Sequence, residues 1–229
     1  MKVIVIQVDG LQLAALGAYG NVWVDTPHLD MLAASSVVFD QHFVGVPSAE
    51  GIARALYGGK TCFPLIEGKH DVKAGQTILE LLSSRNVICH VVHQGRQNSS
   101  SPEVEPISTP CSVLGADDLQ GHLRPLDEFE NALVWLQTDI FPPWEVSPDR
   151  FAKQCEDWEF EEEPPPWPDP EPGWLNPADD ISFARLQRTY AAVVEDLDEK
   201  LGEWFDLLAQ QAWWREAVFI FTAARGQNL

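Results

Sequence analysis

Two ends of predicted strands hold the first candidates for chemistry. The predicted strand at residues 2–8 is followed by Asp9 and Gly10, and the last apolar run, in "AVFIFTAARG", leads to Ala224 and Arg225. Strand ends in α/β proteins are where ligands usually bind, and a carboxylate there suits a hard cation. Asp9 is therefore a candidate metal ligand. Arg225 offers a fixed positive charge, and we expect it to form an ion pair with Asp9.

One serine and three histidines form a second set of candidates. Ser48 could act as a nucleophile activated by a base such as His42, or it could cap the helix that it precedes. His90 and His93 lie in the apolar stretch "NVICHVVHQG". They could be anion donors or a displaced metal pair, or ordinary histidines near a strand end. The residues themselves leave these alternatives open.

Alternating strands and helices must position these residues. Helices are predicted near residues 26–35, 48–58, 77–85 and 182–209, with Thr26 as the cap of the first. Residues 94–126 look rich in loops. Strands are predicted at residues 2–8, 37–43, 86–92, 131–138 and 217–222. The alternation predicts an α/β fold with a largely parallel sheet sandwiched by helices, within a single domain over residues 1–229.

Composition excludes several classes of function. The chain has 229 residues, a net charge of -20 and a pI of about 4.4, so nucleic acid and anionic membranes are not expected as partners. No apolar run is long enough to span a membrane, and the first one is too short for a signal peptide. A cytoplasmic location follows as an expectation. The spacing of the cysteines favours free buried thiols over disulfides or a zinc site, at Cys62, Cys89, Cys111 and Cys155.

An acidic segment rich in proline and tryptophan interrupts the pattern at about residues 156–180. It reads "EDWEFEEEPPPWPDPEPGWLNPADD" and has neither a helical nor an alternating period. We expect a surface excursion with polyproline character. Its tryptophans, Trp158, Trp167 and Trp174, either fold back over the domain or form a contact surface for a partner.

The order of these stretches resembles the N-terminal part of the sulfatase family, in the alkaline phosphatase superfamily, over nearly the whole chain. "VIVIQVDGLQLAALGAYGNVWVDTPHLDMLA" looks like the sulfatase opening, and "IARALYGGK" is similar to the helix after the sulfatase nucleophile. "LVWLQTDIFPPWEVSPDRF" looks like the strand and loop with a Pro-His-x-Pro segment. "YAAVVEDLDEKLGEWFDLLAQQAWWREAVFIFTAARG" resembles the helix and strand that lead to Ser-Asp-His-Gly. The resemblance implies the sulfatase fold, ending before the C-terminal subdomain.

The family's metal ligands are mostly replaced in this sequence. Sulfatases bind a divalent cation, usually calcium, through an opening pair of aspartates and a later Asp-His or Asp-Asn pair. The opening pair becomes Asp9 and Gly10 here, and the later pair aligns with Ala224 and Arg225. Only Asp9 keeps its ligand position. No cofactor is therefore expected, with calcium as the ion if the family's metal site persists.

The family's nucleophile and histidine positions are replaced as well. Without a gap the nucleophilic cysteine aligns with Ala49, and a shift of one residue puts Ser48 there, but neither register restores Cys-x-Pro-x-Arg. Glu50, in the first turn of that helix, would repel a substrate anion. The histidine of Pro-His-x-Pro aligns with Phe141.

Three functional hypotheses follow from this pattern. The first is a sulfatase-like pseudoenzyme that has lost sulfuric-ester hydrolase activity and acts by binding or assembly. A protein partner or a second copy would then cover the free edge of its sheet. The second is an active metal-dependent hydrolase of sulfate or phosphate esters that uses Ser48 and Asp9. The third is an interaction module that binds a partner through the acidic Trp/Pro segment.

Overall fold

The chain is described by a computed structural model, which forms two compact units. It describes residues 1–45, 49–59, 77–94, 112–115, 119–158, 164–171, 173, 175–176 and 179–227. Unit 1 contains Met1–Val8, Phe39–Asp139 and Leu208–Arg225, and unit 2 contains Asp9–Val38, Ile140–Leu207 and Gly226–Leu229. The expectation of a single domain stays a prediction. Among the described residues, no helix has the length and apolar character needed to cross a membrane.

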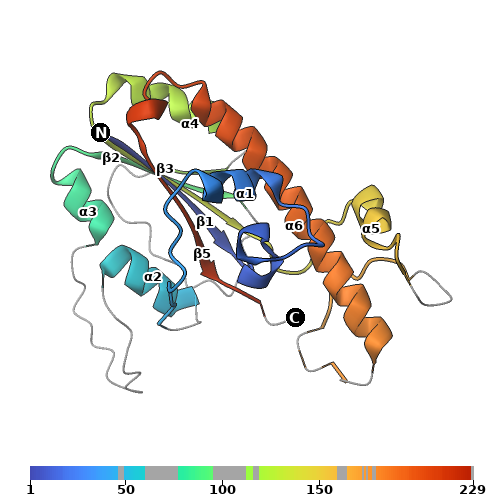
Figure 1. Cartoon of the computed structure of the whole chain (residues 1–229). Helices are drawn as coiled ribbons and strands as arrows, with labels where there is room; N and C mark the ends of the chain where they lie inside the picture. The colour runs from blue at the N-terminus through green and yellow to red at the C-terminus, as the bar shows by residue number, and fades with distance from the viewer. Residues whose placement is uncertain are drawn as a thin grey trace, which may run out of the picture. The chain divides into compact units, whose positions relative to one another are not determined.

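A five-stranded sheet forms the centre of unit 1 (Figure 1). Its strand order is β3-β2-β4-β1-β5, and β2 runs parallel to both β3 and β4. The strands are β1 (Lys2–Asp9), β2 (Ile88–Gln94), β3 (Ser112–Gly115), β4 (Ala132–Asp139) and β5 (Val218–Arg225). The predicted α/β class with a parallel sheet is confirmed.

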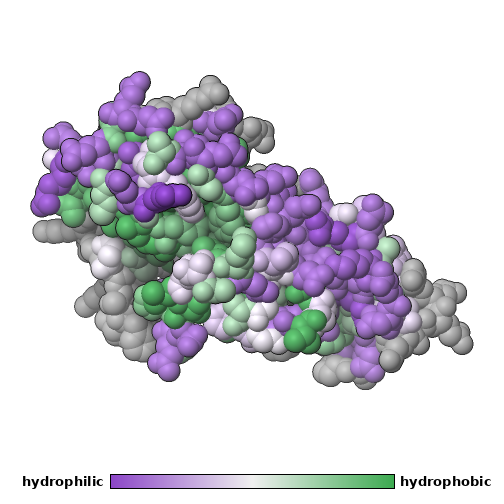
Figure 2. Space-filling view, turned by 45° about the horizontal axis from the view of Figure 1, so that its top comes forward, coloured by the Kyte–Doolittle hydropathy of each residue, from purple (hydrophilic) through white to green (hydrophobic). Residues whose placement is uncertain are grey.

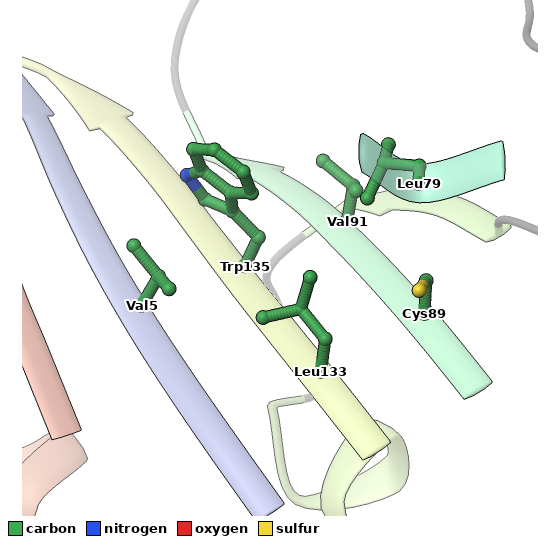
Figure 3. Close-up of a cluster of buried hydrophobic side chains, with 6 residues drawn as sticks. All are labelled: Val5, Leu79, Cys89, Val91, Leu133 and Trp135. Atoms are coloured by element: carbon green, nitrogen blue, oxygen red, sulfur yellow. The ribbon is translucent and has the colours of Figure 1, made fainter. Parts of the chain in front are cut away.

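One hydrophobic core of unit 1 lies between the sheet and two helices. Figure 3 shows the buried side chains of this core. The helices are α2 (Ala49–Gly58) and α3 (Ile78–Ser83), and α3 begins with a capping box between Thr77 and Glu80. Leu56 and Tyr57 of α2 pack against the buried cluster, whose members are Val5, Leu79, Cys89, Val91, Leu133 and Trp135. Alternate residues of β1 on its other face, such as Ile4 and Ile6, are also buried, as expected for a strand in a parallel sheet.

One prediction about the secondary structure was wrong, and another stays a prediction. Within residues 94–126, which look rich in loops, the described part contains a strand, β3, and a short helix, α4 (Leu119–Leu123). Residues 37–43 form no strand, and Val37, Phe39 and Phe43 are largely exposed. Their apolar and β-branched types favour a strand, but a strand also needs a paired neighbour, and the described residues give this segment none.

The described α-helices of unit 2 are α1 (Pro27–Ala34), α5 (Pro148–Gln154) and most of α6 (Asp180–Ala209). α6 confirms the predicted last helix, and it buries two carboxylates, Glu195 and Asp198. Buried carboxylates are costly unless hydrogen bonds or opposite charges compensate them. Both are compensated here, by different neighbouring elements.

Asp198 caps the start of α1 from the middle of α6. Its carboxylate accepts hydrogen bonds from the backbone N–H groups of His28 and Leu29, at 3.1 and 2.9 Å, and contacts Nδ1 of His28 at 2.9 Å. Thr26 was predicted to cap this helix, but it makes no capping bond, because its hydroxyl accepts the N–H of Gly17 instead. Asp198 therefore supplies what a local cap would normally supply.

Glu195 is held by α5 and the loop before α1. It accepts hydrogen bonds from the side-chain amide of Gln154 at 2.8 Å and from the backbone N–H of Asp25 at 3.1 Å. Arg150 lies 3.7 Å from it and also pairs with Asp196 and Glu199. Burial disfavours the charged guanidinium, but these carboxylates outweigh that effect and raise the pKa of Arg150. The cluster joins α5 to α6 electrostatically.

The cap made by Asp198 gives a prediction about stability. Asp198→Ala leaves two backbone N–H groups without their acceptor, so we expect the free energy of unfolding to fall by about 2–4 kcal/mol. Glu199→Ala is the matched control, because Glu199 is the next residue on α6 but is mostly exposed, and its loss should cost about 1 kcal/mol or less. Urea unfolding followed by circular dichroism measures both, and equal losses would contradict the capping role.

Candidate functional site

Asp9 and Arg225 end two strands that are neighbours in the sheet. Asp9 is the last residue of β1 and Arg225 the last of β5, and the arrows of these strands point the same way in Figure 1. Both residues thus lie at the carboxyl ends of their strands, where α/β proteins usually bind ligands. The ion pair between Asp9 and Arg225 stays a prediction.

A hydrogen-bonded group of backbone and glutamine atoms follows directly after β1, within unit 2. The side-chain amide of Gln227 donates to the carbonyl oxygens of Gly10 and Ile140, at 3.1 and 2.8 Å. Gly10 has φ of 90°, a conformation that favours glycine. A Cβ atom added to Gly10 would lie 2.9 Å from Nε2 of Gln227. The amide therefore occupies space beside Gly10 into which a side chain would extend.

Tyr190 of α6 completes this group, which we call the strand-end network (Gly10, Gln12, Ile140, Tyr190 and Gln227). Its hydroxyl donates to the carbonyl oxygen of Gly10 at 2.9 Å and accepts the backbone N–H of Gln12 at 2.8 Å. The side chain of Gln12 in turn donates to the carbonyl oxygen of Gln227. Burial raises the pKa of Tyr190 to about 12, although the N–H of Gln12 opposes the shift. The hydroxyl therefore stays a donor at neutral pH.

A second polar group lies in unit 1, on the face of the sheet that α2 covers. Oε1 of Gln7 accepts hydrogen bonds from the indole N–H of Trp135 at 3.0 Å and from the amide of Gln137 at 3.3 Å. Gln137 also donates to the hydroxyl of Tyr57 on α2. These bonds join β1, β4 and α2 near the ends of the two strands.

Sequence reasoning missed both polar groups. A signal was present for the one in unit 1, because Gln7 and Gln137 are isolated amides near the ends of two apolar runs. Buried amides need partners, so they could have been expected to meet each other. Gln227 and Tyr190 gave no comparable signal, because their partners are backbone carbonyl oxygens, which any sequence provides.

The predicted catalytic residues are only partly described. Ser48 lies outside the described residues, and Ala49 begins α2 with its side chain not described. His42 is exposed in the loop before them. His90 is half-buried in β2, opposite Val134 of β4, and His93 lies in the same strand with its side chain outside the described set. The roles proposed for them stay predictions.

Two further positions that align with functional residues of sulfatases, Phe141 and Ala224, have apolar side chains, which cannot bind a metal ion. Ala224 is buried in β5, and Phe141 is half-buried just after Ile140, whose backbone N–H donates to the carbonyl oxygen of Asp9 at 2.9 Å. In the part of the chain that the structure describes, no three His, Cys, Asp or Glu side chains gather in a way that could hold a metal ion. The free thiols of Cys89 and Cys155 are buried, as predicted, and Cys62 and Cys111 lie outside the described residues.

The described parts of the acidic Trp/Pro segment fold back onto α6. Arg185 lies over the ring of Trp167, 5.2 Å from its centroid, and its guanidinium donates to the carbonyl oxygens of Pro165 and Pro166. Arg188 lies 5.6 Å from the ring centroid of Trp158 and pairs with Asp157. Two of its three tryptophans therefore contact arginines of the same chain, and Trp174 lies outside the described residues.

Comparison with solved structures found proteins with the same arrangement of elements. A phosphonate monoester hydrolase of Agrobacterium radiobacter matches with a TM-score of 0.64 and 15% identity, over 99% of this chain and 62% of its own. The C-terminal periplasmic domain of phosphoethanolamine transferase EptC from Campylobacter jejuni matches with a TM-score of 0.60 and 14% identity, over 100% of this chain and 70% of its own. The corresponding EptC domain of Escherichia coli gives 0.57 and 11%, over 99% and 64%.

These matches are limited to the fold. No family model and no curated protein matches the chain. The chain spans 62% of the hydrolase chain, so it corresponds to part of that structure. The two transferase domains are periplasmic by description, and the cytoplasmic location expected for this chain stays a prediction. Together, the parallel sheet, its helices and these neighbours show that the chain has the fold of the alkaline phosphatase and sulfatase superfamily.

Proposed function

We propose that this chain is a sulfatase-like protein without hydrolase activity, which acts by binding or assembly. The observation that carries the proposal is the position of the Gln227 amide beside Gly10. When the sequence is aligned with sulfatases, Gly10 occupies the position of the second aspartate of the opening pair, which binds calcium in that family. Here the neighbouring space contains an N–H donor instead of a carboxylate, and an N–H donor repels a cation.

The residues at the strand ends do not fit a calcium ion. Calcium takes six to eight oxygen ligands, with several carboxylates among them. Asp9 is the one carboxylate at the family's ligand positions, and Ala224 and Arg225 replace the later pair. The carbonyl oxygens of Gly10 and Ile140, which could otherwise contribute, already accept hydrogen bonds from Gln227. The strand-end network thus supports a closed site, in which side chains of the protein itself, rather than a calcium ion, bond to the carbonyl oxygens at the strand ends.

The rival proposal is an active ester hydrolase that uses Ser48. It draws support from the fold, because one structural neighbour is a phosphonate monoester hydrolase. In that version Asp9 would hold a metal ion and a base such as His42 would activate Ser48. His42 is exposed on a loop, and a base must come within hydrogen-bond reach of its nucleophile, so the geometry around Ser48 decides between the two.

An activity assay tests the loss of hydrolysis. We expect purified protein to show no turnover above the buffer blank with aryl sulfate, aryl phosphate and aryl phosphonate esters, each with calcium, magnesium or manganese. The physical reason is that the proposed site would have no metal ion to stabilise the charge that develops in the transition state. It would also lack the family's nucleophile motif. Ser48→Ala and Asp9→Asn are the matched variants. Turnover by the wild type that either variant abolishes would refute the proposal.

Removal of the Gln227 amide tests the closed site directly. Gln227→Ala should lower the free energy of unfolding by about 1–2 kcal/mol, because the carbonyl oxygens of Gly10 and Ile140 each lose one of their two donors. They keep the hydroxyl of Tyr190 and the indole N–H of Trp144. Calcium should not raise the melting temperature of the wild type, since a ligand that binds only the folded state must stabilise it. Gln187→Ala, at a half-buried glutamine on α6, is the control. A calcium-dependent rise in the melting temperature of the wild type would sink the closed site.

The buried hydroxyl of Tyr190 makes stability depend on alkaline pH. Its pKa is about 12 in the folded state and about 10 when unfolded, so its contribution is complete below pH 10 and is lost as pH rises toward 12. We expect absorbance at about 295 nm to show a late ionisation phase near pH 12 from Tyr190. Tyr190→Phe should remove that late phase, and a late phase that persists in this variant would assign it to another tyrosine.

A further inference from the structure

A pocket of about 190 Å³ lies within unit 2 and shares two residues with the strand-end network. It is formed by α6 and by the segment between β1 and α1. Beside two alanines and a valine, its lining consists of Gln12, Asn21, Trp23, Gln187 and Tyr190. The volume is below the range of about 300–1,000 Å³ that suits drug-sized ligands, so the pocket fits a ligand with a single ring.

Trp23 of the pocket stands on a loop that the side chain of Asn21 holds in place. Oδ1 of Asn21 accepts the backbone N–H groups of Trp23 and Val24, at 3.0 and 2.8 Å. Its amide group donates to the carbonyl oxygen of Ala14 at 2.7 Å. Val24 is buried, whereas Trp23 is 47% exposed. The loop therefore presents an aromatic ring from a fixed backbone, which lowers the entropic cost of binding a ligand.

Polar groups of the pocket keep hydrogen-bonding capacity for a ligand. Among the described residues, the side-chain amide of Gln187 and the indole N–H of Trp23 have no hydrogen-bond partner. Gln12 uses its N–H group on Gln227, which leaves its side-chain oxygen able to accept another bond. Donors and acceptors are thus both present. This mixture matches hydroxyl groups, because each hydroxyl can donate and accept.

The lining of the pocket carries no charge among the described residues, although the chain has a net charge of -20. The charged residues beside it in sequence, Asp25 and Arg188, are paired with Lys153 and Asp157. Figure 2 shows mostly hydrophilic residues around α5 and the first half of α6, the half that contributes to the pocket. An ionic ligand would lose water here without gaining a partner of opposite charge, so the pocket favours a neutral ligand.

We propose that this pocket binds a neutral sugar, either a monosaccharide or the terminal unit of a saccharide. The C–H groups on one face of the sugar ring stack on Trp23, and its hydroxyl groups bond to the side chains of Gln187 and Gln12. Such a site gives a ligand to the binding part of the proposed function. It does not depend on whether the protein hydrolyses esters, because none of the candidate catalytic residues lines the pocket.

Saturation-transfer NMR titration of the full chain tests the proposal with glucose, galactose, mannose and N-acetylglucosamine. We expect at least one of these sugars to bind with a dissociation constant of about 0.1–10 mM, as suits a contact limited to one ring. Glucuronic acid and glucosamine, which carry a charge, should bind at least about tenfold more weakly than that sugar. The affinity for the neutral sugar should not change with salt concentration, because salt screens charges only.

Variants locate the sugar in the pocket. Trp23→Ala should weaken binding at least about fivefold, because the ring on which the sugar stacks is lost, whereas Trp23→Phe should keep most of the affinity. Gln187→Ala should weaken binding about threefold to tenfold, as expected for a lost hydrogen bond. Val22→Ala is the matched control, because Val22 precedes Trp23 and is 94% exposed but does not line the pocket. Circular dichroism checks folding, and Gln187→Ala decides the outcome if Trp23→Ala unfolds.

Three results would overturn the sugar site. They are a wild type that binds none of the neutral sugars, charged sugars that bind as tightly as the neutral one, and binding that folded Trp23→Ala and Gln187→Ala proteins both retain in full. None of these results affects the loss of hydrolysis, because the activity assay is read separately. Ester turnover by a protein that binds sugar would refute the proposed function and leave the pocket's role standing.

Discussion

A strand in a parallel sheet needs a backbone partner on each side and apolar cover on both faces. β1 satisfies both needs, because it lies between β4 and β5 and buries residues of both faces, such as Ile4 and Val5. Among the described strands, β5 has β1 as its neighbour. The same requirement explains why residues 37–43 form no strand despite their composition, since no described strand pairs with them.

Where parallel strands end, the backbone turns and its carbonyl oxygens lose their regular partners. Many α/β proteins use this region to bind a ligand, because unpaired polar groups converge there. In this protein the glutamine and tyrosine side chains of the strand-end network bond to those groups. Neutral amide and hydroxyl groups thus satisfy the carbonyl oxygens of Gly10 and Ile140, and these hydrogen bonds do not depend on ordinary changes of pH.

Most of the fold could be predicted from the sequence, because strands β1, β2, β4 and β5 and helices α1, α3 and α6 each have a clear local pattern. β3 could not, since its four residues lie in a polar stretch and are defined by pairing with β2. The cap of α1 was assigned to the nearest polar residue, Thr26, whereas the residue that caps it is 170 positions away from His28. The strand-end network was missed for the same reason, because its bonds join distant segments through backbone oxygens.

The cap that α6 provides to α1 has a consequence for the order in which the chain folds. α1 is eight residues long, too short to be stable alone, and its first N–H groups are satisfied by Asp198. During synthesis, α1 leaves the ribosome long before that carboxylate has been made. We therefore expect α1 to lack this cap until the part of α6 that contains Asp198 has been translated.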